Sequence, residues 1–196
     1  MIAKNMFYTW YKPFYEYGII HGDPHLGNYT IQQNHTVNLF DFGCMRIFKG
    51  KFIQGVIDLY YALQNNDNEK AVHAYTQWGF TDITKNKLAV LNKWAGFIYS
   101  PLMEDKVQKI QESDSGIYGA KVAAEVHKEL KKLGGVKPPK EFVFMDRAAV
   151  GLGSVFMHLK AEVNWYQIFH DLIKNFDEKK LNDRQQRTLK LVDLKL

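Results

Sequence analysis

Hydrophobic residues recur at helical spacing along most of this chain. In the segment from Ile2 to Tyr17 the large apolar side chains return every three or four residues, Pro13 is expected to bend the helix, and Gly18 ends it. Gly, Pro or polar clusters bound the later segments with the same period. These are Phe52 to Leu63, Asn68 to Trp78 (ended by Gly79), Lys85 to Tyr99, Ser115 to Leu133, Lys140 to Lys160 and a following segment to Phe176. The pattern predicts a mainly α fold.

Two short runs depart from the helical period. Tyr29 to Gln32 and Val37 to Phe40 are rich in Tyr, Thr, Ile, Val and Phe, and the polar residues 33–35 separate them. Such runs predict a small β-hairpin. Because a hairpin carries the chain out and back, Asn28 and Asp41 are expected to lie side by side at its open end.

Residues that can carry chemistry flank this hairpin. His21-Gly-Asp23-Pro-His-Leu-Gly-Asn28 precedes it, and Asp41-Phe-Gly43 follows it. The spacing H-x-D-x-x-x-x-N followed by D-F-G is that of a kinase-type phosphoryl-transfer site. Asp23 would orient an attacking hydroxyl or water or take its proton. Asn28 and Asp41 would be the metal ligands that hold Mg²⁺ against the phosphates of ATP, because magnesium prefers oxygen ligands.

Two other interpretations of these residues remain open. A lone Asp-Phe-Gly is a common turn at the end of a strand, and a lone His-x-Asp is no more specific. His21, Asp23 and His25 would also suit zinc, but no further ligand lies at local spacing, since His35 is in the hairpin loop. The order of the two motifs around a hairpin favours the phosphoryl-transfer site.

Composition and charge narrow the setting. The chain has 196 residues, enough for one domain with a real core. Cys44 is the only cysteine, which indicates a reducing compartment, and no secretory leader pattern opens the sequence. The longest apolar stretch, Ala148 to Met157, is too short to span a bilayer. A net charge of +5 permits contact with nucleotides or anionic lipids. We expect a cytoplasmic protein with peripheral contact at the inner membrane and no nucleic-acid partner.

The segment after Asp-Phe-Gly indicates the class of acceptor. Kinases that act on peptides carry a long activation segment ending near Ala-Pro-Glu. Here Lys49-Gly50-Lys51 leads almost directly into a predicted helix, and Gly22 stands where such kinases have an Arg. A small-molecule or lipid-like acceptor is therefore expected.

Three C-terminal features have structural interpretations. Gly151-x-Gly153 lacks the context of a phosphate loop and is interpreted as helix packing at small residues. Arg147 is expected to form a buried ion pair with Asp146 or Glu162. Residues 177–196 are charged, without a clear helical period at their end, and are expected to be a solvated or loosely packed tail.

The motif residues resemble a known family. His-Gly-Asp-Pro-His-x-Gly-Asn with Asp-Phe-Gly is similar to the UbiB/AarF family of atypical kinases, which support ubiquinone biosynthesis. Pro24 separates it from aminoglycoside and choline phosphotransferases, where Leu is usual, whereas Leu26 departs from the family, where Pro is usual. Further similarities are Asn66-Asp67 through Trp78-Gly79-Phe80, and Pro138-Pro139 followed by Arg147-Ala148-Ala149. The resemblance, from about residue 1 to about 175, implies a kinase-like C-terminal lobe over residues 1–176, with ATP and Mg²⁺ as cofactors and a quinone precursor or lipid as substrate.

A kinase also needs an N-terminal lobe that covers the nucleotide. Twenty residues precede His21, and neither the Lys-x-Gly-Gln signature nor the alanine-rich loop of the family is among them. We therefore expect a C-terminal lobe alone, with a separate N-lobe chain as a candidate partner. Two hypotheses remain: a phosphotransferase or ATPase that acts with its other half, and a non-catalytic nucleotide-binding or interaction module. An aminoglycoside/choline-type phosphotransferase is the alternative enzyme.

Overall fold

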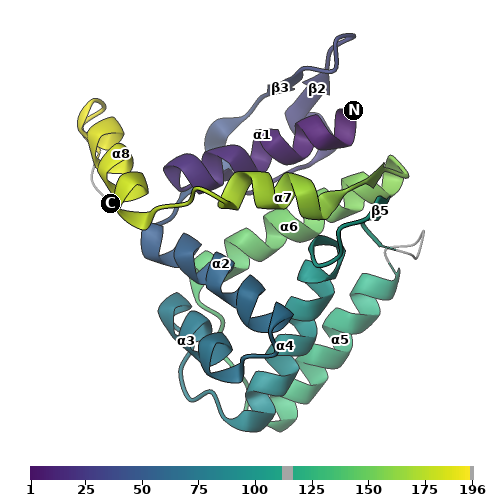
Figure 1. The fold of residues 1–196 in the computed structure, drawn as a ribbon, viewed down its shortest axis with the longest axis vertical. Coiled ribbons are helices and arrows are strands. Elements are labelled where there is room, and N and C mark those ends of the chain that lie inside the picture. The colour runs from purple at the N-terminus through teal and green to yellow at the C-terminus, as the bar shows by residue number, and fades with distance from the viewer. Residues whose placement is uncertain (112–116, 195–196) are drawn as a thin grey trace.

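The described part of the protein is a body of helices with three small antiparallel sheets (Figure 1). The structure, a computed structural model, describes residues 1–111 and 117–194. The helices are α1 (Ile2–Tyr17), α2 (Gly50–Gln64), α3 (Asn68–Trp78), α4 (Lys85–Tyr99), α5 (Ile117–Lys132), α6 (Lys140–His158), α7 (Trp165–Ile173) and α8 (Glu178–Lys190). The strands are β1 (Ile19–His21), β2 (Tyr29–Ile31), β3 (Val37–Leu39), β4 (Met45–Ile47), β5 (Gln108–Lys109) and β6 (Glu162–Val163). The mainly α fold class and the β2–β3 hairpin are confirmed.

Local signals in the sequence determine several helix ends. Gly18 and Gly79 follow α1 and α3 in the left-handed conformation that favours glycine, and their N–H groups bond the last carbonyls of each helix. Asp67 and Thr84 accept hydrogen bonds from the first turns of α3 and α4. The predicted bounds of α1, α3 and α4 agree with the structure. The predicted start of α5 at Ser115 lies outside the described residues.

Helix α1 lies at the centre of the hydrophobic core. Its buried face includes Met6, Trp10 and Phe14, each at most 1% exposed. The ring of Trp10 packs edge-on against Tyr29 of the hairpin, and Phe14 packs edge-on against Phe48 beyond β4. These aromatic contacts join α1 to both sides of the segment 21–48. Helix α1 therefore holds that segment in place.

The two sheets next to α1 are nested. Strand β1 pairs antiparallel with β4, with His21 opposite Met45, and the β2–β3 hairpin lies in the chain between them, with Tyr29 opposite Leu39. The β1–β4 pairing was not predicted from the sequence. It closes residues 22–44 into one loop, so the segments before and after the hairpin are held side by side.

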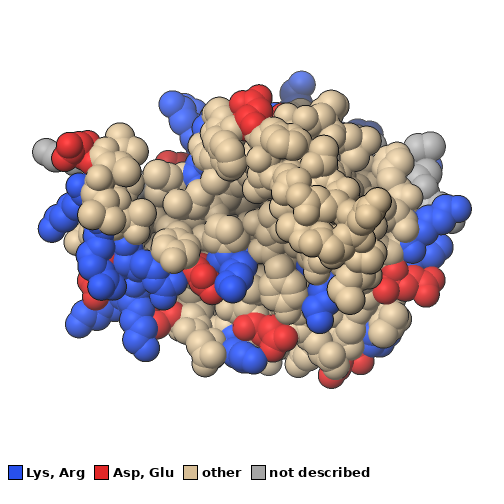
Figure 2. Space-filling view, turned by 90° about the horizontal axis from the view of Figure 1, so that it is seen from above, with Lys and Arg blue, Asp and Glu red and all other residues tan. Residues whose placement is uncertain are grey.

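The C-terminal segment corrects one prediction. Residues 178–190 form helix α8, which buries Leu181, Gln185 and Leu189 instead of forming a loose tail. The Gln185 amide donates to the carbonyls of Tyr17 and Phe48, and Asn182 Oδ1 accepts the N–H of Gly50 at the start of α2. Viewed from above, Lys and Arg side chains gather at the end of the molecule where α8 lies (Figure 2). Helix α8 is therefore docked through one face and presents a basic face to solvent.

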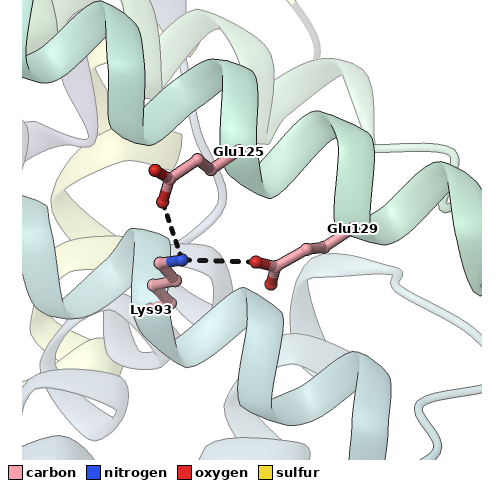
Figure 3. A network of polar contacts seen from close by, with 3 residues as sticks. All are labelled: Lys93, Glu125 and Glu129. Carbon is pink, nitrogen blue, oxygen red and sulfur yellow. Dashed lines mark hydrogen bonds and ion pairs between the residues drawn. The ribbon is translucent and has the colours of Figure 1, made fainter.

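Helix α5 is held against α4 by a small separate cluster. Val90 of α4 packs with Val122 and Val126 of α5. On the surface, Lys93 Nζ donates to Glu125 Oε2 at 2.9 Å and to Glu129 Oε1 at 3.3 Å (Figure 3). Exposed ion pairs of this kind contribute little to stability. The apolar contact is therefore expected to provide most of the attachment of α5.

Among residues 1–111 and 117–194, no helix combines the length and the hydropathy needed to cross a bilayer.

Candidate active site

The backbone around the nested strands brings the two motifs together. The N–H of Gly22 donates to the carbonyl of Cys44 at 2.9 Å, and the N–H of Phe40 donates to the carbonyl of Asn28 at 2.8 Å. A Cβ atom at Gly22 would lie 3.1 Å from that same Cys44 oxygen, so the close approach favours glycine here. The loop 22–28 and the segment 40–44 therefore lie in direct contact, as the hairpin predicted.

His21 links these two segments through its side chain. The ring is 2% exposed, and its Nδ1 accepts the backbone N–H of Asp23 at 3.2 Å. With Nδ1 as acceptor, Nε2 carries the proton in the neutral ring and donates to the backbone carbonyl of Asp41 at 3.1 Å. The carbonyl of His21 accepts the indole N–H of Trp10 at 3.0 Å. His21 thus fixes Asp23 relative to Asp41, a role that the sequence motif alone did not reveal.

Asp23 and Asn28 are joined directly. The Asn28 amide nitrogen donates to Asp23 Oδ2 at 2.9 Å and to the Asp23 carbonyl at 3.1 Å. Because the nitrogen is committed to Asp23, the amide oxygen is the atom of Asn28 that remains for a ligand. A neutral oxygen held in place in this way suits a hard cation. The structure therefore brings together two of the three predicted site residues through their side chains.

Asp41 is held in an uncommon backbone conformation. Its φ is 49° and ψ is 74°, and its Oδ1 accepts the N–H of Gly43 at 3.2 Å. Aspartate tolerates this left-handed region better than most residues, but non-glycine residues found there often mark functional sites. Asp41 is exposed, and His21 connects its backbone to Asp23. The short distance expected between the side-chain oxygens of Asn28 and Asp41 stays a prediction.

The donor set fits magnesium better than zinc. No group of three or more His, Cys, Asp or Glu side chains able to hold a metal occurs among the described residues. Both ring nitrogens of His21 have protein partners, and Nδ1 of the exposed His25 accepts the N–H of Gly27. One carboxylate from Asp41 and one amide oxygen from Asn28 instead match Mg²⁺, which takes its other ligands from phosphate and water.

Large apolar side chains next to the site residues in the sequence are exposed to solvent. Leu26, Phe40 and Phe42 are 70%, 47% and 62% exposed. Leu26 belongs to the 3-10 turn Leu26–Asn28, and Phe42 to the 3-10 turn Phe42–Cys44. Exposed large apolar side chains gathered around one site commonly mark an interaction surface.

Helix α6 packs closely against the loop that carries Asp23. A Cβ atom at Gly151 would lie 2.5 Å from Cγ of Pro24, the residue next to Asp23, whereas a Cβ at Gly153 would meet no atom within 4 Å. The prediction of tight helix packing is therefore confirmed at Gly151, but it is wrong at Gly153. The predicted buried ion pair of Arg147 is also wrong: Arg147 is exposed, and Asp146 accepts the indole N–H of Trp94 at 2.8 Å.

The two glycines of α6 provide a matched pair of variants. Gly151→Ala is expected to destabilise the protein by about 1–3 kcal/mol and to displace the Asp23 loop, because the proline ring cannot yield. Gly153→Ala should stabilise it by about 0.5–1 kcal/mol through helix propensity. Urea unfolding measures both changes, and amide NMR shifts of residues 22–28 report the displacement. Equal effects of the two variants would contradict the assigned contact.

Comparisons with known proteins give a family match over the part of the chain that carries the site residues. Residues 1–75 match the model of a family described as the ABC1 atypical kinase-like domain. The matched part includes α1, all the site residues and α2. A curated relative from Clostridium pasteurianum, described as an uncharacterized protein in the hydrogenase 1 5′ region, is 20% identical over 174 residues. The alignment covers 89% of this chain and 31% of that relative. The match supports the prediction of an atypical kinase-like lobe.

Proposed function

We propose that residues 1–176 form the C-terminal lobe of a UbiB-type atypical kinase or ATPase, which performs Mg-ATP-dependent phosphoryl transfer in support of ubiquinone biosynthesis. The observation that carries this proposal is the hydrogen-bonded unit of His21, Asp23 and Asn28, connected to Asp41. The family match over residues 1–75 supports the same assignment.

Each site residue has a distinct role in this proposal. Asp41 supplies a carboxylate and Asn28 an amide oxygen to the magnesium ion of Mg-ATP. Bound magnesium neutralises charge on the phosphates. Asp23, held by Asn28 and by the Nδ1 of His21, orients the attacking hydroxyl or water and accepts its proton.

The route of the chain after the site favours a small acceptor. Strand β4 ends at Ile47, Phe48 is buried against α1, and α2 begins at Gly50. This leaves no room for a long activation segment on which a peptide would lie. A quinone precursor or a lipid is the acceptor class we propose, and the basic face of α8 supplies positive charge for peripheral contact with an anionic membrane surface.

A bound nucleotide also needs a lobe that covers its other side. Among the described residues, the segment before the site is the single helix α1, which is packed into the core and is not a nucleotide-covering lobe. The exposed Leu26, Phe40 and Phe42 form an apolar rim suited to contact with such a lobe. A nucleotide-covering lobe, in the same polypeptide or in a separate chain, is therefore the partner of these residues in this proposal.

Mg-ATP binding to the chain of 196 residues tests the proposal. We expect weak binding, with a dissociation constant on the order of 0.1–1 mM, and little turnover, because one side of the nucleotide stays in water. Binding should weaken when magnesium is chelated, and Asp41→Asn should weaken binding and raise the magnesium concentration that it requires. Isothermal titration with and without EDTA measures both effects.

Three outcomes would contradict the proposal. Submicromolar ATP affinity or robust hydrolysis by this chain alone would show that it needs no second lobe. Binding that does not depend on magnesium would favour the non-catalytic interaction module. Phosphorylation of an aminoglycoside or of choline, once an N-lobe is supplied, would instead assign the chain to that class of phosphotransferase.

A further inference from the structure

A cavity of about 380 Å³ lies inside the helical body, apart from the site residues. Helices α1 to α7 all contribute to its walls, which are mainly aromatic and aliphatic. An apolar cavity of about 150 Å³ is enough to hold benzene in another protein. The space here is sufficient for an elongated molecule of about a dozen non-hydrogen atoms.

Several phenol groups converge on this cavity. Tyr11 and Tyr15 reach it from α1, Tyr75 from α3 and Tyr99 from α4. Burial first, and then the neighbouring phenols of Tyr15, Tyr75 and Tyr11, raise the pKa of Tyr99. The hydroxyl of Tyr99 donates a hydrogen bond to the carbonyl of Val56 at 2.9 Å. These four tyrosines therefore form a cluster of neutral hydroxyls in an apolar interior.

One of these hydroxyls is unsatisfied. Tyr75 is 1% exposed, and its hydroxyl is a buried group for which the described part of the chain provides no hydrogen-bond partner. Gln111 Oε1, a second buried atom on the cavity wall, also has no partner there. A buried polar group without a partner costs free energy, and such groups in native proteins commonly have a bound molecule as partner. The cavity thus offers one donor and one acceptor to an occupant.

The charged groups around the cavity restrict the charge that a ligand can carry. Among the described lining residues none is Lys, Arg or His, so no cation is present to balance an anionic ligand. The one carboxylic acid, Asp146, accepts the indole N–H of Trp94, and burial raises its pKa. An ionised carboxylate would repel an anion, and a carboxyl group that favours its neutral form attracts a cation weakly.

We propose that this cavity is a binding site for an uncharged, mainly apolar small molecule with one hydroxyl or carbonyl oxygen, which accepts a hydrogen bond from the Tyr75 hydroxyl. The site is distinct from the phosphoryl-transfer residues and does not depend on their assignment. Helix α6 borders both, since Gly151 contacts Pro24 while Ala149 and Gly153 line the cavity.

Three ten-carbon probes test the proposal on the full chain. They are 1-decanol, decanoate and decylamine, whose head groups are neutral, anionic and cationic at pH 7. Trp78 and Trp94 line the cavity, so tryptophan emission reports occupancy directly, and the melting temperature reports binding to the folded state. We expect saturable binding of 1-decanol, with decanoate and decylamine at least tenfold weaker.

Glycine variants separate the cavity from non-specific binding. A Cβ atom at Gly153 meets no neighbour within 4 Å and Gly153 lines the cavity, so Gly153→Leu should fill the space and weaken 1-decanol binding at least tenfold. Gly96 of α4 also has open space at its Cβ but does not line the cavity, so Gly96→Leu should bind within twofold of the wild type. Tyr75→Phe keeps the ring and should weaken binding about three- to tenfold by removing the donor.

Several results would overturn the proposal. They are no saturable response of the wild type to 1-decanol, equal binding by a folded Gly153→Leu variant, or stronger binding of decanoate or decylamine than of 1-decanol. If Gly153→Leu does not fold, Tyr75→Phe decides the matter, because unchanged affinity in that variant contradicts the assigned hydrogen bond.

Discussion

Asp23→Asn is expected to slow phosphoryl transfer by about 10²–10⁴-fold while leaving Mg-ATP affinity within threefold of the wild type. The asparagine oxygen can still accept the hydrogen bond that Asn28 donates at 2.9 Å, so the loop should keep its shape. What is lost is the charge that orients and deprotonates the nucleophile, an interaction that matters mainly in the transition state. Turnover is measured on the chain supplied with a kinase N-lobe, and Mg-ATP binding by titration.

Two further variants serve as controls for this assignment. Asp41→Asn should raise the magnesium requirement and weaken nucleotide binding together, because Asp41 supplies the carboxylate ligand. Asn28→Ala should fall between the two, since water can partly replace one neutral ligand. If Asp23→Asn abolished nucleotide binding while Asp41→Asn spared it, the two roles would be reversed and the kinase assignment would fail.

Helices with local stop signals could be predicted from the sequence. Gly18 and Gly79 adopt positive φ after α1 and α3, and Ser100-Pro101 follows α4, so each end is encoded within a few residues of the helix. The hairpin could also be predicted, because its two strands and the polar loop between them are encoded within a few residues of each other. It predicts that Asn28 and Asp41 approach each other, and the backbone hydrogen bond from Phe40 to Asn28 shows that the segments carrying them are in contact.

Interactions between distant segments left no such signal. Strand β1 pairs with β4 across more than twenty intervening residues, and strands of three residues are too short for a period-2 pattern to identify them. The bridging role of His21 depends on that pairing and on Trp10 beneath it. The cavity around Tyr75 likewise depends on how seven helices pack, and no motif in the chain encodes it.

Helix α8 was missed because a polar residue occupies the middle of its buried stripe. Leu181, Gln185 and Leu189 follow helical spacing, but the central side chain is an amide, 3% exposed, which looks like a surface residue in the sequence. Only the structure shows that Gln185 satisfies the carbonyls of Tyr17 and Phe48. The last residues of the chain, which lack a helical period, lie beyond this helix.

The junction at Gly18 is where a single added methyl group should cost the most stability. Its φ is +70°, and a Cβ atom there would lie 2.5 Å from the Phe48 oxygen and 2.6 Å from Gln185 Nε2. The Phe48 carbonyl cannot retreat easily, because the Phe48 N–H donates to the Gly18 carbonyl at 2.7 Å. Gly18→Ala therefore combines backbone strain with a clash and is expected to lower the free energy of unfolding by about 3–5 kcal/mol.

Gly134→Ala separates the two contributions. Gly134 has φ +87°, but a Cβ atom there meets nothing within 4 Å, so this variant carries the strain without the clash and should cost about 1–2 kcal/mol. Urea unfolding compares the two variants, and hydrogen exchange of the α8 amides tests whether Gly18→Ala releases that helix, since the methyl group displaces Gln185. If both variants lost the same stability and α8 stayed protected, the close packing of α1, β4 and α8 around Gly18 would be wrong.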